Sequence, residues 1–305
     1  MGTVLLTRRI PSSVLSHLES HHSVDLYAGE GPIPREELLR RIDGKDALIS
    51  MLSDRIDGEI AERGKPSLKI IATVAVGYDN IDVAAVRSRG IVVTHTPDVL
   101  TEATAEFTWA LILGIARRVG EADRLIRAGG WKGWSLDFML GTELRGKQLG
   151  IIGAGRIGRA VAAKAPVFGM RAVFAKHDMS LDELLVTSDV ISIHSAATPE
   201  NRHLINRKTL IRMKRSAILV NTARGSLVDE EALVWALDER LLAGVALDVF
   251  EREPNVHPGL LKHENVLLAP HLGSATRETR TAMADLAVRN VLSVLSGGPP
   301  LTPIA

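Results

Sequence analysis

The feature that most constrains the fold is a run of three glycines, Gly153-Ala-Gly155-Arg-Ile-Gly158, set between an apolar segment and a helical one. Residues 148–152 have the pattern of a short buried strand, and residues 159–164 have that of a helix. In such a turn the first glycine permits the bend, the second lets the backbone approach a pyrophosphate, and the third lets the helix lie close to the strand. The N–H groups at the start of the helix then face the phosphate. Three glycines can also occur in a turn that binds no ligand. The flanking strand and helix nevertheless favour a dinucleotide site formed by Gly153, Gly155, Arg156, Ile157 and Gly158.

Strand-like and helix-like segments alternate along nearly the whole chain, which predicts parallel sheets covered by helices on both faces. Early strands are expected at 4–6, 46–51, 69–73 and 91–94, and the alternation restarts at 148 after a long helical stretch over 101–128. A chain of 305 residues exceeds what one core usually serves. The last helix, expected over about 275–296, follows the second unit's final strand and returns to the first unit. We therefore predict an α/β protein of two doubly wound domains: a discontinuous, flavodoxin-like substrate domain (1–97 plus 274–305) and a Rossmann-type cofactor domain (98–273).

Composition narrows the function. The 37 Lys and Arg residues nearly balance the 36 Asp and Glu residues, so the chain has no overall field to attract nucleic acid or an anionic membrane. Cysteine is absent, which excludes disulfides, thiolate metal ligands and cysteine nucleophiles. The apolar start is too short for a secretory signal, and the apolar run over 107–116 is shorter than a membrane span. We expect a cytoplasmic protein without a metal site, a membrane or a nucleic-acid partner.

Three further strands are followed at once by polar residues, namely Arg224, Glu253 and His271. Because ligands bind at the carboxyl ends of parallel strands, these side chains are expected to converge on the edge that carries the glycine turn. Arginine binds a carboxylate through two hydrogen bonds, histidine moves a proton near neutral pH, and a carboxylate orients the histidine ring. The plain alternative is that all three are solvated loop residues. The other histidines lack such partners in the sequence, and we expect His21, His22, His257 and His263 at the surface.

The chain resembles the D-isomer-specific 2-hydroxyacid dehydrogenases, especially their glyoxylate and hydroxypyruvate reductase branch. The resemblance runs over nearly the whole sequence, through the glycine turn and the motifs at 74–82, 96–104, 221–225, 247–254 and 270–275.

The resemblance implies NAD(P)-dependent reduction of a small 2-keto acid, with Arg224 binding the keto acid, His271 as the acid/base and Glu253 as its partner. It also implies that backbone N–H groups of Val76 and Gly77 hold the substrate carboxylate. Asp248 is expected on the nicotinamide side, and the other implied cofactor contacts are Thr104, Ala223 and Gly273. Reduction of 2-ketogluconate is a close alternative, and a nucleotide-sensing corepressor is the alternative from another class.

Two departures from the family pattern lie beside the cofactor. The loop after His194 reads Ser195-Ala-Ala-Thr-Pro199 where the family has an earlier proline, and about a dozen residues are missing between the strand at 172–175 and the helix near 180. An NAD site normally places an acidic residue about 20 residues beyond the glycine turn, but here Lys176 and His177 occupy that position. We therefore predict a preference for NADP(H), with NAD(H) possible if Asp178 takes the acceptor position.

The loop over 129–134 places Trp131 and Trp134 among glycines, beside the long helical stretch. Tryptophans in such a loop suit an interface, so a homodimer through the cofactor domain is expected. The resemblance implies that Trp134 approaches the neighbouring subunit's active site. The alternative is that both tryptophans cap their own domain.

Overall fold

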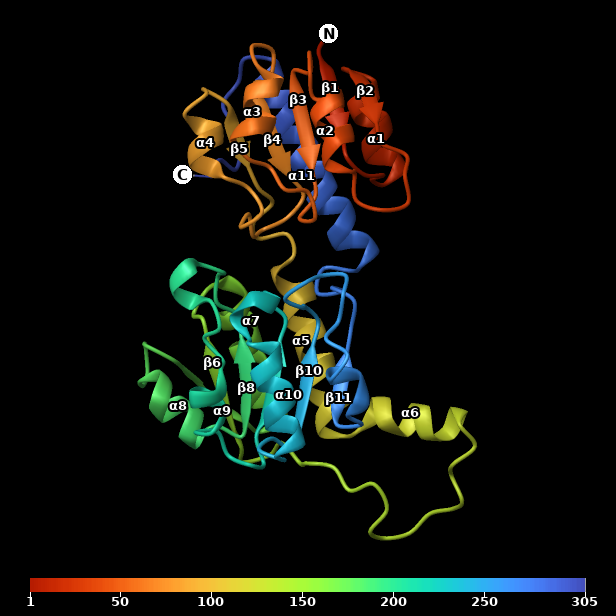
Figure 1. The fold of residues 1–305 in the computed structure, drawn as a ribbon, viewed down its shortest axis with the longest axis vertical. Helices are drawn as coiled ribbons and strands as arrows, with labels where there is room; N and C mark the ends of the chain where they lie inside the picture. Colours follow the sequence, from red (N-terminus) through yellow and green to blue (C-terminus); the bar gives the residue numbers. More distant parts are fainter. Residues whose placement is uncertain (305) are drawn as a thin grey trace. The chain divides into compact units, whose positions relative to one another are not determined.

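The computed structural model describes residues 1–304. The chain divides into two compact units (Figure 1): unit 1 holds Met1–Leu100 and the segment that begins at Thr276, and unit 2 holds Thr101–Ala275. The chain thus leaves unit 1 once and re-enters it at its last helix. No helix among the described residues is long and apolar enough to cross a membrane.

Unit 1 is built on a five-stranded sheet with the order β2-β1-β3-β4-β5, and its strand pairings are parallel. The strands are β1 (Thr3–Leu6), β2 (Ser23–Leu26), β3 (Ala47–Ser50), β4 (Ile70–Thr73) and β5 (Val92–Thr94). β3 and β4 are buried along their whole length, as expected for parallel strands covered on both faces. This strand order is the flavodoxin-like one.

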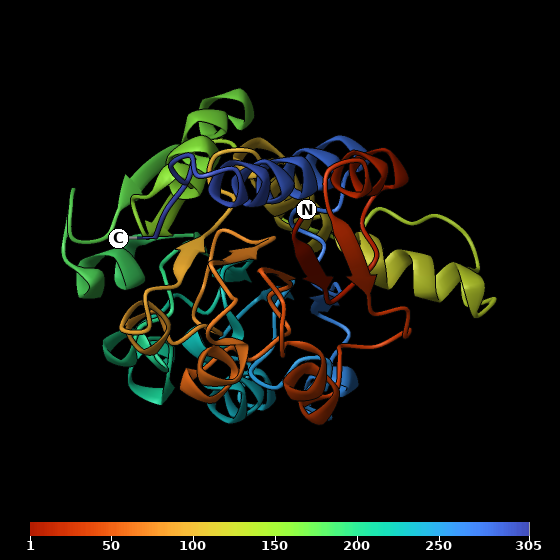
Figure 2. The ribbon, with the colours of Figure 1, turned by 90° about the horizontal axis from the view of Figure 1, so that it is seen from above.

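Helices cover both faces of the unit 1 sheet, and Figures 1 and 2 show α1 and α11 together on one of them. The helices are α1 (Ser12–Glu19), α2 (Arg35–Arg41), α3 (Gly58–Gly64), α4 (Val83–Arg87) and α11 (Arg277–Leu295). α1 and α11 share a core with Val4 and Leu6, whereas α2, α3 and α4 pack on the opposite face around Leu5 and Leu48. Thr276 begins α11 by accepting a hydrogen bond from the N–H of Thr279.

Unit 2 is built on a six-stranded parallel sheet with the order β11-β10-β9-β8-β6-β7. The strands are β6 (Gln148–Ile152), β7 (Arg171–Phe174), β8 (Val190–Ile193), β9 (Ile218–Asn221), β10 (Gly244–Leu247) and β11 (Val266–Leu268). The helices are α5 (Thr101–Ala116), α6 (Val119–Arg127), α7 (Arg156–Lys164), α8 (Leu181–Thr187), α9 (Arg207–Leu210) and α10 (Glu230–Asp238). α5 and α7 pack on one face of the sheet, and α8, α9 and α10 pack on the other. The predicted α/β architecture with two parallel sheets is confirmed.

The strand order of unit 2 differs from the usual dinucleotide-binding order at one edge, where the usual order has a further strand beyond the second one. Here β7, the second strand of the unit, is at the sheet edge. A tight turn follows it, and residues 175 and 179 pair as an isolated bridge just before α8 begins. The short segment after Lys176 therefore leaves this edge without the additional strand.

The long helix predicted over 101–128 is wrong in one respect, because the structure has two helices there. α5 ends at Ala116, and Arg118 adopts a left-handed φ of 55° that an α-helix cannot contain. The chain turns at this point, and α6 then runs away from the body of unit 2 into an extended segment (Figure 1). A sequence with continuous helical periodicity did not reveal this break.

Candidate functional site

The glycine turn has the geometry that its spacing predicts. Gly153 has a φ of 111°, and a Cβ there would lie 2.5 Å from the carbonyl carbon of His194. A Cβ on Gly158 would lie 2.1 Å from the carbonyl oxygen of Gly153, so α7 packs directly on the turn. By contrast, the space beside Gly155 is open. The turn is therefore closely packed against the protein at Gly153 and Gly158, and open beside Gly155.

The open side coincides with the start of α7. Gly155 is the N-cap of this helix and offers no side chain to accept the first N–H groups, which in several other helices of this chain, though not in α1, α2 or α6, are capped by Asp, Asn, Ser or Thr. Uncapped N–H groups and the positive end of a helix dipole suit a phosphate. The residues present therefore fit a dinucleotide pyrophosphate, with Arg156 and Ile157 in the first helical turn.

The turn after β7 holds the residues predicted to read the ribose. Lys176 has a left-handed φ of 64° and lies at the tip. The Asp178 carboxylate closes the turn by accepting the N–H of Phe174 at 2.7 Å, and its other oxygen lies 3.3 Å from Nδ1 of His177. That backbone hydrogen bond, and then the one with His177, hold the pKa of Asp178 below its usual value. Asp178 is thus bound into the turn itself.

Glu253 and His271 come together at the carboxyl edge of the unit 2 sheet. The N–H at Nδ1 of His271 donates to Oε2 of Glu253 over 2.9 Å, and the N–H of Phe250 donates to Oε1 over 3.1 Å. Burial alone would raise the pKa of Glu253, but the hydrogen bond and electrostatic interaction with His271, the Phe250 N–H and the charge of Arg224 together outweigh it, and the pKa lies below its ordinary value. Glu253 is therefore a carboxylate at neutral pH. Because that carboxylate only accepts, the proton stays on Nδ1, and Nε2 is the nitrogen left to exchange one.

The loop that carries His271 is anchored by Asp248, which follows β10. The Asp248 side chain is 1% exposed, and its two carboxylate oxygens accept the N–H groups of Leu272 at 2.6 Å and Gly273 at 2.8 Å. The N–H of His271 donates to the carbonyl of Asp248 itself. Burial raises the pKa of Asp248. Thr104 lies beside Gly273, so it forms part of the same packed corner. The sequence predicted a nicotinamide contact at Asp248 and missed this anchoring role.

Arg224 follows β9 on the same edge. A Cβ on Gly225 would lie 1.9 Å from the carbonyl carbon of Phe250, so the backbone after Arg224 packs directly on the backbone before Glu253. The guanidinium donates to the carbonyl of Ala223 at 2.9 Å, and Asn221 Nδ2 donates to the carbonyl of Arg224 at 2.8 Å. The charge of Arg224 also contributes to the low pKa of Glu253. The structure thus brings the three predicted strand-end residues to neighbouring positions in unit 2.

Val76 and Gly77 belong to unit 1, in the loop after β4. The N–H at Nδ1 of His95 donates to the carbonyl of Val76 at 3.0 Å, and the Tyr78 ring meets the His95 ring edge-on. Asn80 Nδ2 joins this loop to the loop after β3, because it donates to the carbonyls of Met51 and Asp54. Sequence reasoning missed His95 and Asn80, and only their closeness to the motif residues pointed to them.

The expectation that the other histidines lack carboxylate partners is wrong for four of them. His177 lies 3.3 Å from Asp178, His203 lies 2.6 Å from Glu251, His257 lies 3.0 Å from Glu231, and His263 lies 3.3 Å from Asp238. His194 differs, since loss of hydration lowers its pKa to about 4 and keeps its ring neutral.

A metal site is not supported among the described residues. They contain no group of three or more His, Cys, Asp or Glu side chains that could hold a metal ion. His17 and His21 do have the spacing of a helical metal-binding pair, and their rings lie 5.2 Å apart. Nδ1 of His21, however, contacts Ser20 and the carbonyl of His17.

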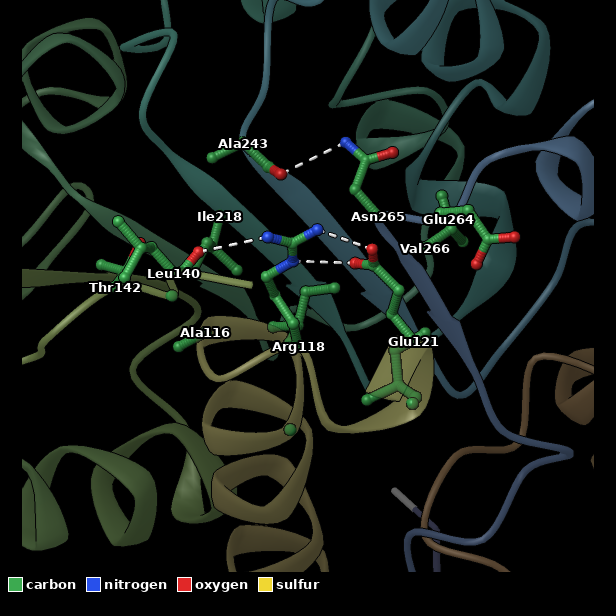
Figure 3. A pocket seen from close by; sticks show the side chains of 15 residues that line it. Ala116, Arg118, Glu121, Leu140, Thr142, Ile218, Ala243, Glu264, Asn265 and Val266 are labelled. Carbon is green, nitrogen blue, oxygen red and sulfur yellow. Dashed lines mark hydrogen bonds and ion pairs between the residues drawn. The ribbon is translucent and has the colours of Figure 1, made fainter. Parts of the chain in front are cut away.

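A hollow of about 380 Å³ lies elsewhere in unit 2 (Figure 3). Its lining includes Ile218 and Val266, the first residues of β9 and β11, so it is at the amino edge of the sheet, opposite the predicted site. Arg118 in this hollow is bound by Glu121 and the carbonyl of Leu140. The hollow therefore shares no residue with the glycine turn or the histidine–carboxylate pair.

Comparisons with known proteins point to one family. Residues 109–273 match the model of the D-isomer specific 2-hydroxyacid dehydrogenase, NAD binding domain. A glyoxylate reductase of Korarchaeum cryptofilum is 47% identical, over 97% of this chain and 94% of its own length. The crystal structure of the TT0316 protein from Thermus thermophilus is 47% identical, with a TM-score of 0.94 over 99% of this chain and 100% of that one.

A ligand-bound structure is also similar. The NADPH-dependent glyoxylate/hydroxypyruvate reductase from Sinorhizobium meliloti, in complex with NADP and malonate, is 33% identical, with a TM-score of 0.87 over 100% of this chain and 97% of that one. The family model and relatives that span nearly the whole sequence thus point to the same family. The chain belongs to the D-isomer specific 2-hydroxyacid dehydrogenase family and is an NAD(P)-dependent oxidoreductase.

Proposed function

We propose that this protein reduces glyoxylate or hydroxypyruvate to the D-2-hydroxy acid. The observation that carries the proposal is the Glu253–His271 pair, at 2.9 Å, on the sheet edge that also holds Arg224 and the glycine turn. The relatives named glyoxylate reductase support the choice of a short 2-keto acid.

Each residue has one task in this reaction. Arg224 binds and orients the keto acid through paired hydrogen bonds. Hydride for C2 of the keto acid is the chemistry that a bound reduced nicotinamide supplies. His271 donates the proton on Nε2 to the keto oxygen as negative charge develops there, and Glu253 stabilises the protonated ring. The carbonyl group thereby gains a hydride on carbon and a proton on oxygen and is reduced to an alcohol.

A substrate panel tests the proposal. Initial rates are measured for glyoxylate, hydroxypyruvate and 2-ketogluconate, each with NADPH and with NADH. The two small acids should have the highest kcat/KM. A clear preference for 2-ketogluconate would assign the alternative reductase activity, and binding of nucleotide without turnover of any keto acid would favour a corepressor-like role.

We further propose that NADPH is the preferred cofactor. Lys176 lies at the tip of the turn after β7, and a cation there attracts a 2′-phosphate. The hydrogen bond from the Phe174 N–H to Asp178 supports the proposal, because it occupies an oxygen that a ribose 2′-hydroxyl would need. Since β7 is the edge strand, no neighbouring strand crowds this turn.

Replacing Lys176 by alanine should therefore lower kcat/KM for NADPH and leave that for NADH nearly unchanged, because only the phosphate contact is lost. Steady-state kinetics with both cofactors measure the ratio. Lys208→Ala, on the exposed side of α9, is the matched control and should leave the ratio unchanged. A wild-type preference for NADH, or an unaltered ratio in Lys176→Ala, would show that Lys176 does not read the phosphate.

We also propose that the protein is a homodimer formed through α6 and the segment that follows it, here called the arm (residues 119–140). α6 has no buried residue, although its sequence is amphipathic. Large apolar side chains of the arm are exposed: Ile126 61%, Trp131 58%, Trp134 80%, Leu136 83% and Leu140 67%. Apolar exposure on this scale is typical of an interaction surface. The arm extends from the body of unit 2, which supports exchange with a second copy (Figure 1).

Replacing Trp131 and Trp134 together by serine should shift the protein from dimer to monomer, because interface tryptophans carry much of the binding free energy. Sedimentation velocity at micromolar concentration measures the change. Ile211→Ser is the control, since Ile211 is 63% exposed but lies at the end of α9, outside the arm. A monomeric wild-type protein would reject the dimer. A dimer unaffected by the double change would move the interface elsewhere.

A further inference from the structure

His203 contacts two loops of unit 2 at the same time. It has a left-handed φ of 51°, a conformation that histidine adopts more readily than most residues. Its backbone N–H donates to the carbonyl of Ser226 at 2.9 Å, in the loop that begins at Arg224. Its Nε2 lies 2.6 Å from Oε1 of Glu251, in the loop that leads to Glu253. One residue thus bridges the arginine loop and the carboxylate loop.

Glu251 is also fixed from its other side. Its backbone N–H donates to Oε1 of Glu230 at 2.8 Å, and Glu230 is only 6% exposed at the start of α10. Burial raises the pKa of Glu230. Arg202 adds a second contact to Oε1 of Glu251, at 3.3 Å. Glu251 is therefore held on one side by Glu230 at the start of α10 and on the other by the side chains of Arg202 and His203.

The two loops are packed tightly enough for such a link to matter. The backbone at Gly225 has no room for a Cβ beside Phe250, and the N–H of Phe250 holds Oε1 of Glu253. A shift of residues 250–251 would therefore move Glu253, and with it the ring of His271. The same shift would open the contact with the loop of Arg224.

We infer that His203 is a positioning residue, which fixes the loop of Arg224 relative to the loop of Glu253 through its contacts with Ser226 and Glu251. The inference rests on the proposed function, because it assigns the binding of substrate to Arg224 and the transfer of the proton to His271. His203 itself contacts neither of these residues in any hydrogen bond described above. His203 acts on the distance between Arg224 and His271.

Kinetics give the first test. His203→Ala should lower kcat/KM for the keto acid about 10- to 100-fold, through both KM and kcat, because small misplacements of reacting groups are costly. The Kd of NADPH should not change. His203→Gln should restore most of the loss, since its amide N–H can still donate to Glu251. His263→Ala is the matched control, because His263 also pairs with a carboxylate, that of Asp238 in α10, but at the opposite edge of the sheet, and it should behave as wild type.

Hydrogen–deuterium exchange of the protein without substrate gives the second test, which does not depend on activity. His203→Ala should increase exchange in peptides that cover both 225–228 and 250–253, whereas His263→Ala should not. Unchanged exchange in either segment, or unchanged kcat/KM in an active enzyme, would overturn the inference. If wild type reduces no 2-keto acid, the proposed function fails, and the exchange result still decides whether His203 joins the loops.

Discussion

Replacing His271 by alanine should lower kcat for keto-acid reduction by about 10²–10⁴-fold, because it removes the group that donates the proton as the alkoxide forms. Binding of NADPH, measured by titration without substrate, should stay close to that of wild type. The loop should persist in this variant, since the N–H groups of residues 271–273 are held by Asp248 and not by the His271 side chain. Rates near those of wild type between pH 6 and 8 would remove His271 from the reaction.

The partner of His271 predicts a change in the pH profile. Because the pKa of Glu253 lies below its usual value, Glu253 is charged throughout the range near neutral pH. Its negative charge favours the protonated ring that reduction requires. Glu253→Gln should therefore shift the alkaline limb of the profile of kcat/KM to lower pH. An unmoved profile would mean that the 2.9 Å contact does not control protonation.

The overall fold was accessible from sequence because its main signals are local. The alternation of strands and helices predicted both parallel sheets. Strands such as β4 and β9, which are mostly apolar and buried at every position, show that signal clearly. The break between α5 and α6 was not accessible, because it depends on the left-handed backbone of Arg118 in a sequence with ordinary helical periodicity. The edge position of β7 depends on strand pairing, which residue patterns do not specify.

The part of the candidate site that could be predicted from sequence is the set of polar residues that directly follow strands. Residues after β9, β10 and β11 must share an edge, so the closeness of Arg224, Glu253 and His271 could be expected. The supporting contacts could not, because they join residues far apart in sequence. His203 meets Glu251 across 48 positions, and His95 meets Val76 across 19. Such pairs carry no spacing pattern, since a histidine in a loop has many possible partners.

Arg224→Lys is expected to lower kcat/KM for the keto acid although it keeps the positive charge. This variant separates the effect of side-chain geometry from that of charge. The planar guanidinium offers two parallel N–H donors to a carboxylate, whereas an ammonium is a point charge that cannot match both oxygens. Losing one hydrogen bond to a charged group costs about 1.5–3 kcal/mol, which corresponds to roughly 10- to 150-fold in kcat/KM. Because Arg224 orients the keto acid in the ground state and in the transition state, both KM and kcat should suffer.

The control for this variant is Arg212→Lys, which changes an arginine that pairs with Asp182 at 3.1 Å on the surface. It should be kinetically normal, because an exposed ion pair tolerates the exchange. The backbone around residue 224 should also survive in Arg224→Lys, since Asn221 holds the carbonyl of residue 224 and not its side chain. A defect therefore reports the lost fork rather than a displaced loop. Wild-type values of KM and kcat in Arg224→Lys would instead make Arg224 a structural residue, and the site would need another group to bind the keto acid.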